Sequence, residues 1–196
     1  MQMEIRPLEP ALLHDFLDFF DDVAFTDHQD WSWCYCTYYL LGKEDEQRIT
    51  AENSGEWTRD IPRNMAIRMI KQRELNGYLA YLEGNVVGWC NAGDKKSYKR
   101  LCENREIWDE DDDQPIKSVT CFIVAPDARR QGIASALLHR VAQDAQKQGY
   151  LVLEAYPASG ELDCYAHYHG HPQMYLTNGF TKHKELQGYC VYRKLL

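Results

Sequence analysis

Long apolar runs, basic excess and a leader-like start are all missing from this sequence. No stretch approaches 18 consecutive apolar residues, which excludes a membrane-spanning helix of ordinary length. Lys and Arg number 22 against 30 Asp and Glu, so the net charge of -8 repels phosphate backbones. Residues 1–7 lack the apolar segment of a secretory signal. We therefore expect a cytoplasmic protein with neither a nucleic-acid nor a membrane partner.

Paired cysteine motifs are also missing. No Cys-x-x-Cys occurs, and Cys34-x-Cys36 is too short for an ordinary structural zinc pair. An odd number of cysteines in a cytosolic-looking chain predicts free thiols. The seven are Cys34, Cys36, Cys90, Cys102, Cys121, Cys164 and Cys190.

The chain is long enough for one folded domain with a full core. It has 196 residues, of which 44% are hydrophobic and 27% charged, which excludes a disordered or collagen-like protein. No repeat or linker divides it, so we predict a single domain over residues 1–196.

Hydrophobic spacing predicts alternating strands and helices. Helices are expected at residues 11–23, from 61 to about 70, at 132–148 and at 172–177. Strands are expected at residues 4–6, 77–83, 86–92, 118–124 and 150–155, and in two runs after residue 180. We also expect a two-residue hairpin turn at Gly84-Asn85 and a surface loop or frayed helix at 42–60. The strand, helix, strand order around residues 118–155 predicts an α/β fold with a crossover between neighbouring strands of a sheet.

The segment 123–138 carries the clearest chemistry. A strand runs into a turn with Arg129, Arg130 and Gly132, and an amphipathic helix follows. The first turn of a helix leaves backbone N–H groups without partners, and they carry partial positive charge. Gly132 and Ala134 let a bulky anion approach that backbone closely. The segment therefore predicts a binding site for a pyrophosphate.

Two common phosphate loops do not match this turn. It lacks the Gly-x-x-x-x-Gly-Lys-Ser/Thr of nucleoside triphosphate loops and the Gly-x-Gly-x-x-Gly of dinucleotide folds. The pattern Arg-x-x-Gly-x-Ala, at Arg129, Gly132 and Ala134, instead resembles the acetyl-CoA motif of the GNAT superfamily of N-acetyltransferases. Residues 175–180, Tyr-Leu-Thr-Asn-Gly-Phe, are similar to that family's second signature near the C-terminus.

The resemblance implies a fold and a cofactor site. The fold is a V-splayed mixed β-sheet flanked by helices, with acetyl-CoA as co-substrate between strands 116–124 and 150–155. Pantetheine pairs with the backbone of Phe122, Ile123 and Val124. The pyrophosphate is held at the turn and helix start, by Arg129, Arg130, Gln131, Gly132, Ile133, Ala134 and Ser135.

The resemblance also implies a catalytic residue, Tyr175, as general acid. A phenol with an ordinary pKa of about 10 keeps its proton at pH 7 and can protonate a leaving thiolate. No base is assigned. Residues 117–124 contain no carboxylate, Glu154 on the next strand has a structural alternative, and the acidic run 109–113 is expected to be a solvated loop.

Two segments are candidates for the acceptor site. The aromatic run 31–39 is either a bulky core segment or an aromatic pocket wall, and Trp31, Trp33 and Tyr35 are its candidate residues. The alternating histidines 167, 169 and 171 lie in a loop that either lines the acceptor pocket, through His169, or is plain surface. No metal site is predicted there, because no Cys or carboxylate supports it at suitable spacing.

The sequence thus predicts an N-acetyltransferase that moves acetyl from acetyl-CoA to a primary amine by direct attack. The acceptor is expected to be a small molecule of unknown identity. The alternative is a non-catalytic acyl-CoA sensor or partner-binding module on the same fold. Dimers are common in the family, so the resemblance allows a homodimer, although the sequence does not decide the oligomeric state.

Overall fold

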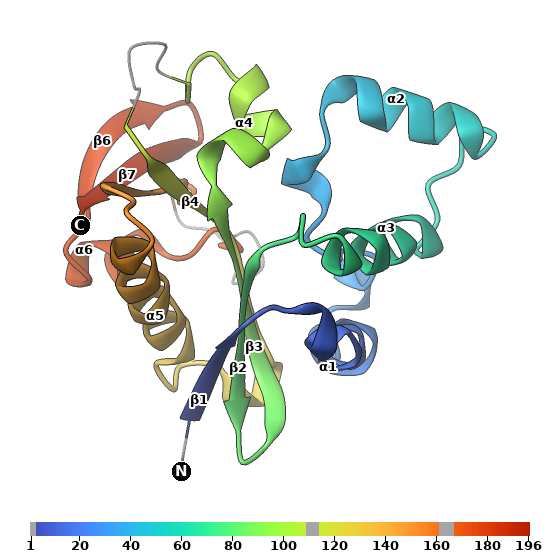
Figure 1. Cartoon of the computed structure of the whole chain (residues 1–196), viewed down its shortest axis with the longest axis horizontal. Helices are drawn as coiled ribbons and strands as arrows, with labels where there is room; N and C mark the ends of the chain where they lie inside the picture. Colours follow the sequence, from blue (N-terminus) through green and yellow to red (C-terminus); the bar gives the residue numbers. More distant parts are fainter. Residues whose placement is uncertain (1–2, 109–113, 161–166) are drawn as a thin grey trace.

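The computed structural model describes residues 3–108, 114–160 and 167–196. Within these ranges a seven-stranded sheet is combined with six α-helices (Figure 1). The strands are β1 Met3–Pro7, β2 Gly77–Leu82, β3 Asn85–Asp94, β4 Ile116–Val124, β5 Val152–Ala155, β6 Thr181–Leu186 and β7 Tyr189–Leu195. The α-helices are α1 Leu13–Asp18, α2 Lys43–Glu52, α3 Asp60–Lys71, α4 Lys99–Glu103, α5 Ile133–Lys147 and α6 Pro172–Thr177. Short helical turns are η1 Pro10–Leu12, η2 Phe19–Val23, η3 Gln29–Trp31, η4 Tyr38–Leu40, η5 Lys95–Ser97 and η6 Pro126–Ala128.

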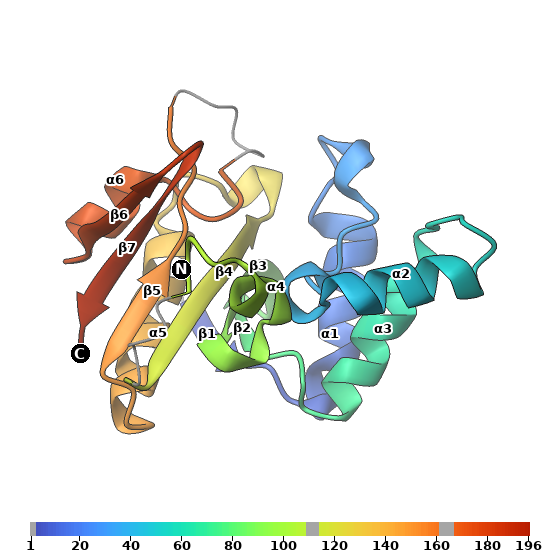
Figure 2. The same ribbon diagram turned by 90° about the horizontal axis from the view of Figure 1, so that it is seen from above.

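The sheet is mixed and opens into a V. Its order is β1-β2-β3-β4-β5-β7-β6, and only the β4–β5 pair is parallel. That pairing runs from Ile116–Val152 to Val119–Ala155 and then stops, whereas β4 continues to Val124 (Figure 2). The gap beyond Val119 is the splay. The predicted α/β fold with a V-splayed mixed sheet is confirmed.

Helices cover both faces of the sheet. Successive residues of β3 lie on opposite faces of the sheet, so Gly88 is on one face and Trp89 is on the other. A Cβ on Gly88 would lie 2.9 Å from Ile133 of α5, whereas the Trp89 ring lies 5.1 Å from that of Phe16 in α1. Helix α5 therefore packs on one face of the central strands, and α1 packs with α3 on the other (Figure 1).

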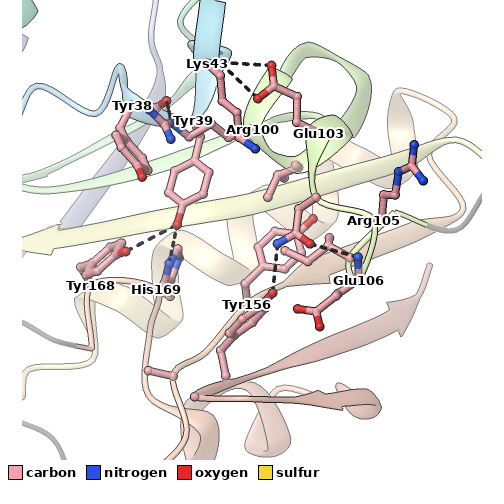
Figure 3. A pocket seen from close by; sticks show the side chains of 16 residues that line it. Tyr38, Tyr39, Lys43, Arg100, Glu103, Arg105, Glu106, Tyr156, Tyr168 and His169 are labelled. Carbon is pink, nitrogen blue, oxygen red and sulfur yellow. Dashed lines mark hydrogen bonds between the residues drawn. The ribbon is translucent and has the colours of Figure 1, made fainter. Parts of the chain in front are cut away.

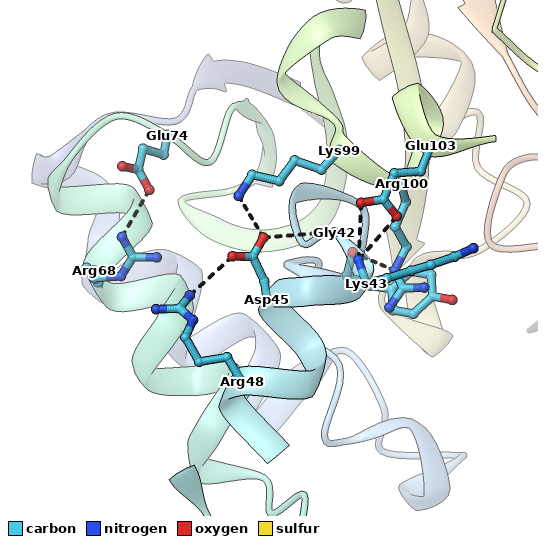
Figure 4. Close-up of polar contacts among 10 residues, drawn as sticks. Gly42, Lys43, Asp45, Arg48, Arg68, Glu74, Lys99, Arg100 and Glu103 are labelled. Carbon is cyan, nitrogen blue, oxygen red and sulfur yellow. Dashed lines mark hydrogen bonds and ion pairs between the residues drawn. The ribbon is translucent and has the colours of Figure 1, made fainter. Parts of the chain in front are cut away.

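Helix α2 stands apart from the sheet and buries no residue. Polar contacts with α4 hold it in place (Figure 4). Asp45 accepts from Lys99 at 2.6 Å and from the Gly42 amide at 3.0 Å, while Glu103 accepts from the Lys43 amide at 3.1 Å. The polar segment 42–60 thus contains an ordered helix whose stability comes from capping and ion pairs rather than from burial.

Most predicted elements are present, with one shifted turn. The 11–23 helix is divided into η1, α1 and the π-helical turn η2. The turn predicted at Gly84-Asn85 is wrong by one residue: Glu83 and Gly84 carry φ of 51° and 86°. Two successive left-handed residues define the hairpin turn that matches strand twist, and Asn85 already belongs to β3.

The sequence also makes predictions on cysteine pairing and membrane-spanning helices. The six cysteines within the described residues are free thiols, as predicted, while Cys164 and the acidic run 109–113 lie outside those residues. Across the described ranges, no helix combines the length and apolarity needed to cross a bilayer.

Candidate functional site

The turn after β4 builds an anion-binding backbone. Arg130 and Gly132 both have left-handed φ, 60° and 81°, which turns the chain sharply into α5. The first intrahelical bond runs from the Ala136 amide to the Gly132 carbonyl at 2.9 Å. The amides of Ile133, Ala134 and Ser135 precede it and so have no partner within the helix. These amides form an electropositive helix start.

A groove of about 650 Å³ runs along this turn. We call it the arginine groove; it is lined by Phe122, Val124, Ala128, Arg129, Arg130, Gly132, Ile133, Ala134, Ser135, Gly160, His167, Gly170, His171 and Met174. Two predicted cofactor residues lie off it. Ile123 pairs with Trp89 of β3, and the Gln131 side chain donates to the Asp127 carbonyl at 3.0 Å.

Arg129 lines the groove but is already bound to an acid. Its guanidinium donates to Asp27 at 2.6 Å and to the Val124 carbonyl at 3.3 Å. The positive charge of Arg129 is therefore shared with Asp27, and the contact ties the end of β4 to the segment before η3. Arg130 is more exposed.

The free edge of β4 faces the splay. The Ala125 amide donates toward β3, to the Val87 carbonyl at 2.9 Å. Because successive amides of a strand alternate in direction, the amides of Val124 and Phe122 face away from β3. The Phe122 amide donates to the Tyr168 carbonyl at 2.6 Å. A segment of the loop before α6 therefore occupies part of this edge.

A second cavity, of about 680 Å³, lies nearby (Figure 3). We call it the tyrosine cavity, because its walls include Tyr38, Tyr39, Tyr156, Tyr168 and Tyr189. Its other lining residues are Lys43, Arg100, Leu101, Glu103, Asn104, Arg105, Glu106, Ile107, Ala158, His169 and Gly188. The contacts between α2 and α4 fix its rim, since Lys43, Arg100 and Glu103 belong to those helices.

Residues 167–171 contribute to both hollows. Tyr168 and His169 line the tyrosine cavity, whereas His167, Gly170 and His171 line the arginine groove. His169 is 8% exposed, and burial lowers its pKa to about 4, so the imidazole is neutral at pH 7. Tyr39 lies within hydrogen-bonding distance of it, with 2.8 Å between the hydroxyl and Nε2 (Figure 3).

The other predicted acceptor residues lie elsewhere. Trp31 packs against Tyr168, with ring centroids 5.6 Å apart, and Trp33 is 47% exposed beside Trp57 at a small separate hollow. Tyr35 is buried and donates to Asp21; burial and this hydrogen bond raise its pKa to about 12. None of the three lines the tyrosine cavity. Tyr38 and Tyr39, from the same aromatic run, do line it, and only the aromatic density of that run signalled them.

Tyr175 is fully buried and lines neither hollow. Its hydroxyl donates to the His169 carbonyl at 2.5 Å, and its ring packs 5.1 Å from Phe180. Burial raises the pKa of the phenol well above its usual value, so it is protonated at pH 7. Whether it acts as the general acid stays a prediction.

Glu154 is engaged in a buried ionic cluster. Its carboxylate accepts from Lys95 at 2.7 Å and from Arg193 at 2.6 Å, and Tyr156 donates to it at 2.7 Å. Ser118 in turn donates to the Tyr156 hydroxyl at 2.7 Å. These contacts give Glu154 a structural role. Over residues 3–108, 114–160 and 167–196, no group of three or more His, Cys, Asp or Glu is arranged to hold a metal ion.

The turn, the groove and the splayed sheet together agree with one protein family. Residues 11–171 match the Acetyltransferase (GNAT) family, and the chain belongs to it. It is a GNAT-type acyltransferase, and the family uses acetyl-CoA as co-substrate. Comparison with curated protein sequences gave no match.

Solved structures from several organisms share this fold. PaiA N-acetyltransferase from Thermoplasma acidophilum, in complex with coenzyme A, has 17% identity, full coverage of both chains and a TM-score of 0.55. A GNAT acetyltransferase from Listeria monocytogenes has 15% identity and a TM-score of 0.57, with 99% of this chain and 95% of that chain covered. Polyamine N-acetyltransferase from Drosophila melanogaster has 12% identity and a TM-score of 0.55, covering 100% and 99%. At such identities the likeness shows the fold.

Proposed function

We propose that this protein transfers acetyl from acetyl-CoA to the primary amine of a small molecule by direct attack. The observation that carries the proposal is that two hollows adjoin along residues 167–171, one of them at the β4 edge. The arginine groove reaches β4 through Phe122 and Val124, and the tyrosine cavity lies on the other side of residues 167–171. A donor in the groove and an acceptor in the cavity then meet at the splay.

The groove suits the phosphate and pantetheine parts of the donor. The amides of Ile133, Ala134 and Ser135 offer donors to a pyrophosphate. A Cβ on Gly132 would meet nothing within 4 Å, so this backbone is open to an approaching ligand. The outward amides of β4 suit an extended amide chain, which can bind like an added strand.

Acetyl-CoA supplies an activated acetyl thioester. The amine, after losing a proton to water, adds to the thioester carbon and forms the C–N bond, which places negative charge on the carbonyl oxygen. The C–S bond then breaks and the thiolate leaves. The outward amide of Val124 is the donor for that oxygen, which leaves the Phe122 amide for the pantetheine chain. Tyr175 holds a proton that can pass to the departing thiolate. The amine's surplus proton leaves to solvent water, because Glu154 is held by two cations.

The tyrosine cavity offers aromatic faces to a cationic amine as acceptor. Such faces attract ammonium and guanidinium groups. The charged side chains of the lining are of both signs: Glu103 and Glu106, with Lys43, Arg100 and Arg105. The Drosophila relative is described as forming N-acetylagmatine, the product of a cationic amine. A homodimer and a cytoplasmic location remain further predictions, tested by light scattering and by cell fractionation.

A matched pair of variants tests the groove. Ser135→Glu places a carboxylate where the pyrophosphate is expected, although a Glu in the first turn of α5 does not disfavour the helix. Ser135→Gln has nearly the same size without the charge. By isothermal titration calorimetry we expect Ser135→Glu to weaken coenzyme A binding at least tenfold relative to Ser135→Gln. Equal affinities in two folded variants would contradict the assignment.

Turnover tests the rest of the proposal. Thiol release from acetyl-CoA is followed with a panel of polyamines, guanidino-amines and aromatic amines. We expect release above background with a cationic member of the panel. Coenzyme A binding without release for any amine would instead favour a binding module.

A further inference from the structure

We propose that residues 167–170, here called the strap, are an autoinhibitory element that leaves the β4 edge when acetyl-CoA binds. The inference rests on the proposed function, because the reaction needs the donors that the strap occupies.

The first occupied donor is the Phe122 amide. It faces the splay and donates to the Tyr168 carbonyl at 2.6 Å. An acyl-pantetheine chain pairing with β4 would bring its own carbonyl oxygen to this edge. The N–H group donates to one acceptor well, so ligand and strap compete for it. Binding at Phe122 therefore requires the Tyr168 carbonyl to withdraw.

The second occupied donor is the Tyr175 hydroxyl. It donates to the His169 carbonyl at 2.5 Å, one residue along the strap. A hydroxyl has a single proton to donate, so Tyr175 cannot serve a thiolate while it serves this carbonyl. Withdrawal of the strap thus frees both the amide donor and the phenol donor. One movement makes two groups of the proposed reaction available together.

Contacts with Tyr39 hold the strap in place from the tyrosine cavity. The Tyr39 hydroxyl lies 2.8 Å from His169 Nε2 and 3.4 Å from the Tyr168 hydroxyl. Tyr39 is absent from the groove lining, so it acts on cofactor binding only through the strap. Gly170, the last residue of the strap, packs closely on Tyr175: a Cβ on Gly170 would lie 2.9 Å from the Tyr175 hydroxyl. Tyr39 is therefore a positioning residue that couples the acceptor cavity to the cofactor groove.

Amide hydrogen exchange on the unmodified protein tests the withdrawal. Bound ligands usually slow exchange where they cover the backbone. We expect coenzyme A to slow exchange at residues 130–136 but to speed it in fragments covering residues 167–170. Exchange there that stays unchanged or becomes slower with coenzyme A bound would overturn the proposal.

Affinity tests the Tyr39 contact. Tyr39→Phe keeps the ring and removes the hydroxyl, which destabilises the strapped state alone. Losing one net hydrogen bond raises the share of open molecules, so coenzyme A should bind about 2- to 10-fold more tightly by calorimetry. Tyr38→Phe is the matched control: that ring lies at the same cavity under Arg100, 3.8 Å away, and its variant should bind like the parent. Unchanged or weaker binding by Tyr39→Phe would remove Tyr39 from the mechanism.

The outcomes separate the two proposals. If neither the parent nor any variant binds coenzyme A, the cofactor groove is wrong and the strap falls with it. If all bind coenzyme A while exchange in the strap does not rise, the groove stands and the strap alone is overturned.

Discussion

Tyr175 is the predicted general acid and also makes a structural hydrogen bond. The phenol is buried and protonated, which an acid requires, and its hydroxyl is already bound to the His169 carbonyl. Under the two proposals, Tyr175 supports the strap in one state and serves as the proton donor in the other. Its two roles respond differently to loss of the hydroxyl.

Tyr175→Phe separates these roles. We expect turnover with an identified amine to fall by about 10²–10⁴-fold, the usual contribution of one positioned acid. Stability should fall by about 1–3 kcal/mol, because the buried His169 carbonyl loses its donor. Coenzyme A should still bind. Steady-state rates, calorimetry and urea unfolding on one preparation give all three values. Turnover at the parent rate would assign the proton to water instead.

At the scale of elements, the close approach of β2 and β3 shapes the sheet that carries the site. Gly77 opens β2 opposite Asn91, and a Cβ there would lie 2.3 Å from both the Cys90 carbonyl oxygen and the Trp89 ring. Neither neighbour can yield easily, because one is backbone and the other is the fully buried centre of the aromatic core. Glycine is required here by contact rather than by backbone conformation.

Gly77→Ala tests this packing. We expect a loss of about 1–3 kcal/mol or more, as for overpacked cores, measured by urea unfolding. Gly84→Ala in the β2–β3 turn is the control, since a Cβ there meets nothing within 4 Å and only the left-handed φ of 86° is strained. That control should lose about 1 kcal/mol. A smaller loss for Gly77→Ala than for Gly84→Ala would contradict the packing argument.

At the scale of the whole molecule, the Glu154 cluster connects distant parts of the chain. Glu154 lies on β5, Arg193 on β7 and Lys95 in η5 after β3, and Ser118 reaches the cluster from β4 through Tyr156. Glu154 and Lys95 are buried and Arg193 is partly buried, so the contacts between them offset the hydration that they lose. The cluster holds together the strands on both sides of the splay.

Glu154→Ala should therefore destabilise the fold strongly. It leaves the buried Lys95 ammonium without the carboxylate that it contacts, which costs about 3–5 kcal/mol. The double variant Lys95→Met with Glu154→Leu removes charges of both signs and should recover part of that loss. Urea unfolding of the single and double variants measures both effects. A loss below about 1 kcal/mol in Glu154→Ala would mean that water or another acid replaces the carboxylate.

Local signals allowed much of the fold and the groove to be predicted. The β4 turn and α5 follow from neighbouring residues: a β-branched strand, glycine at a left-handed position, and apolar residues at helical spacing. The hairpin was misplaced by one residue because Glu83 takes the left-handed conformation that Asn85 was expected to supply. Such an error is local too, since both choices fit the same strand pattern.

What the sequence by itself determined is most of the strands and helices and the chemistry of the helix start, because both depend on residues close together in the chain. Helix α4 was not predicted, and α2 was predicted only as an alternative to a loop. Only the tertiary structure decided which aromatic residues of 31–39 face the cavity, since that run has no period. The backbone of this run contacts a residue far along the chain: the Asn91 side chain donates to the Cys36 carbonyl at 2.9 Å, and Cys36 itself has a left-handed φ of 53°. The position of the strap was also decided by the tertiary structure. The hydrogen bond from the Phe122 amide to the Tyr168 carbonyl joins residues distant in the chain, and it forms because the splayed strands and the loop before α6 pack together in space.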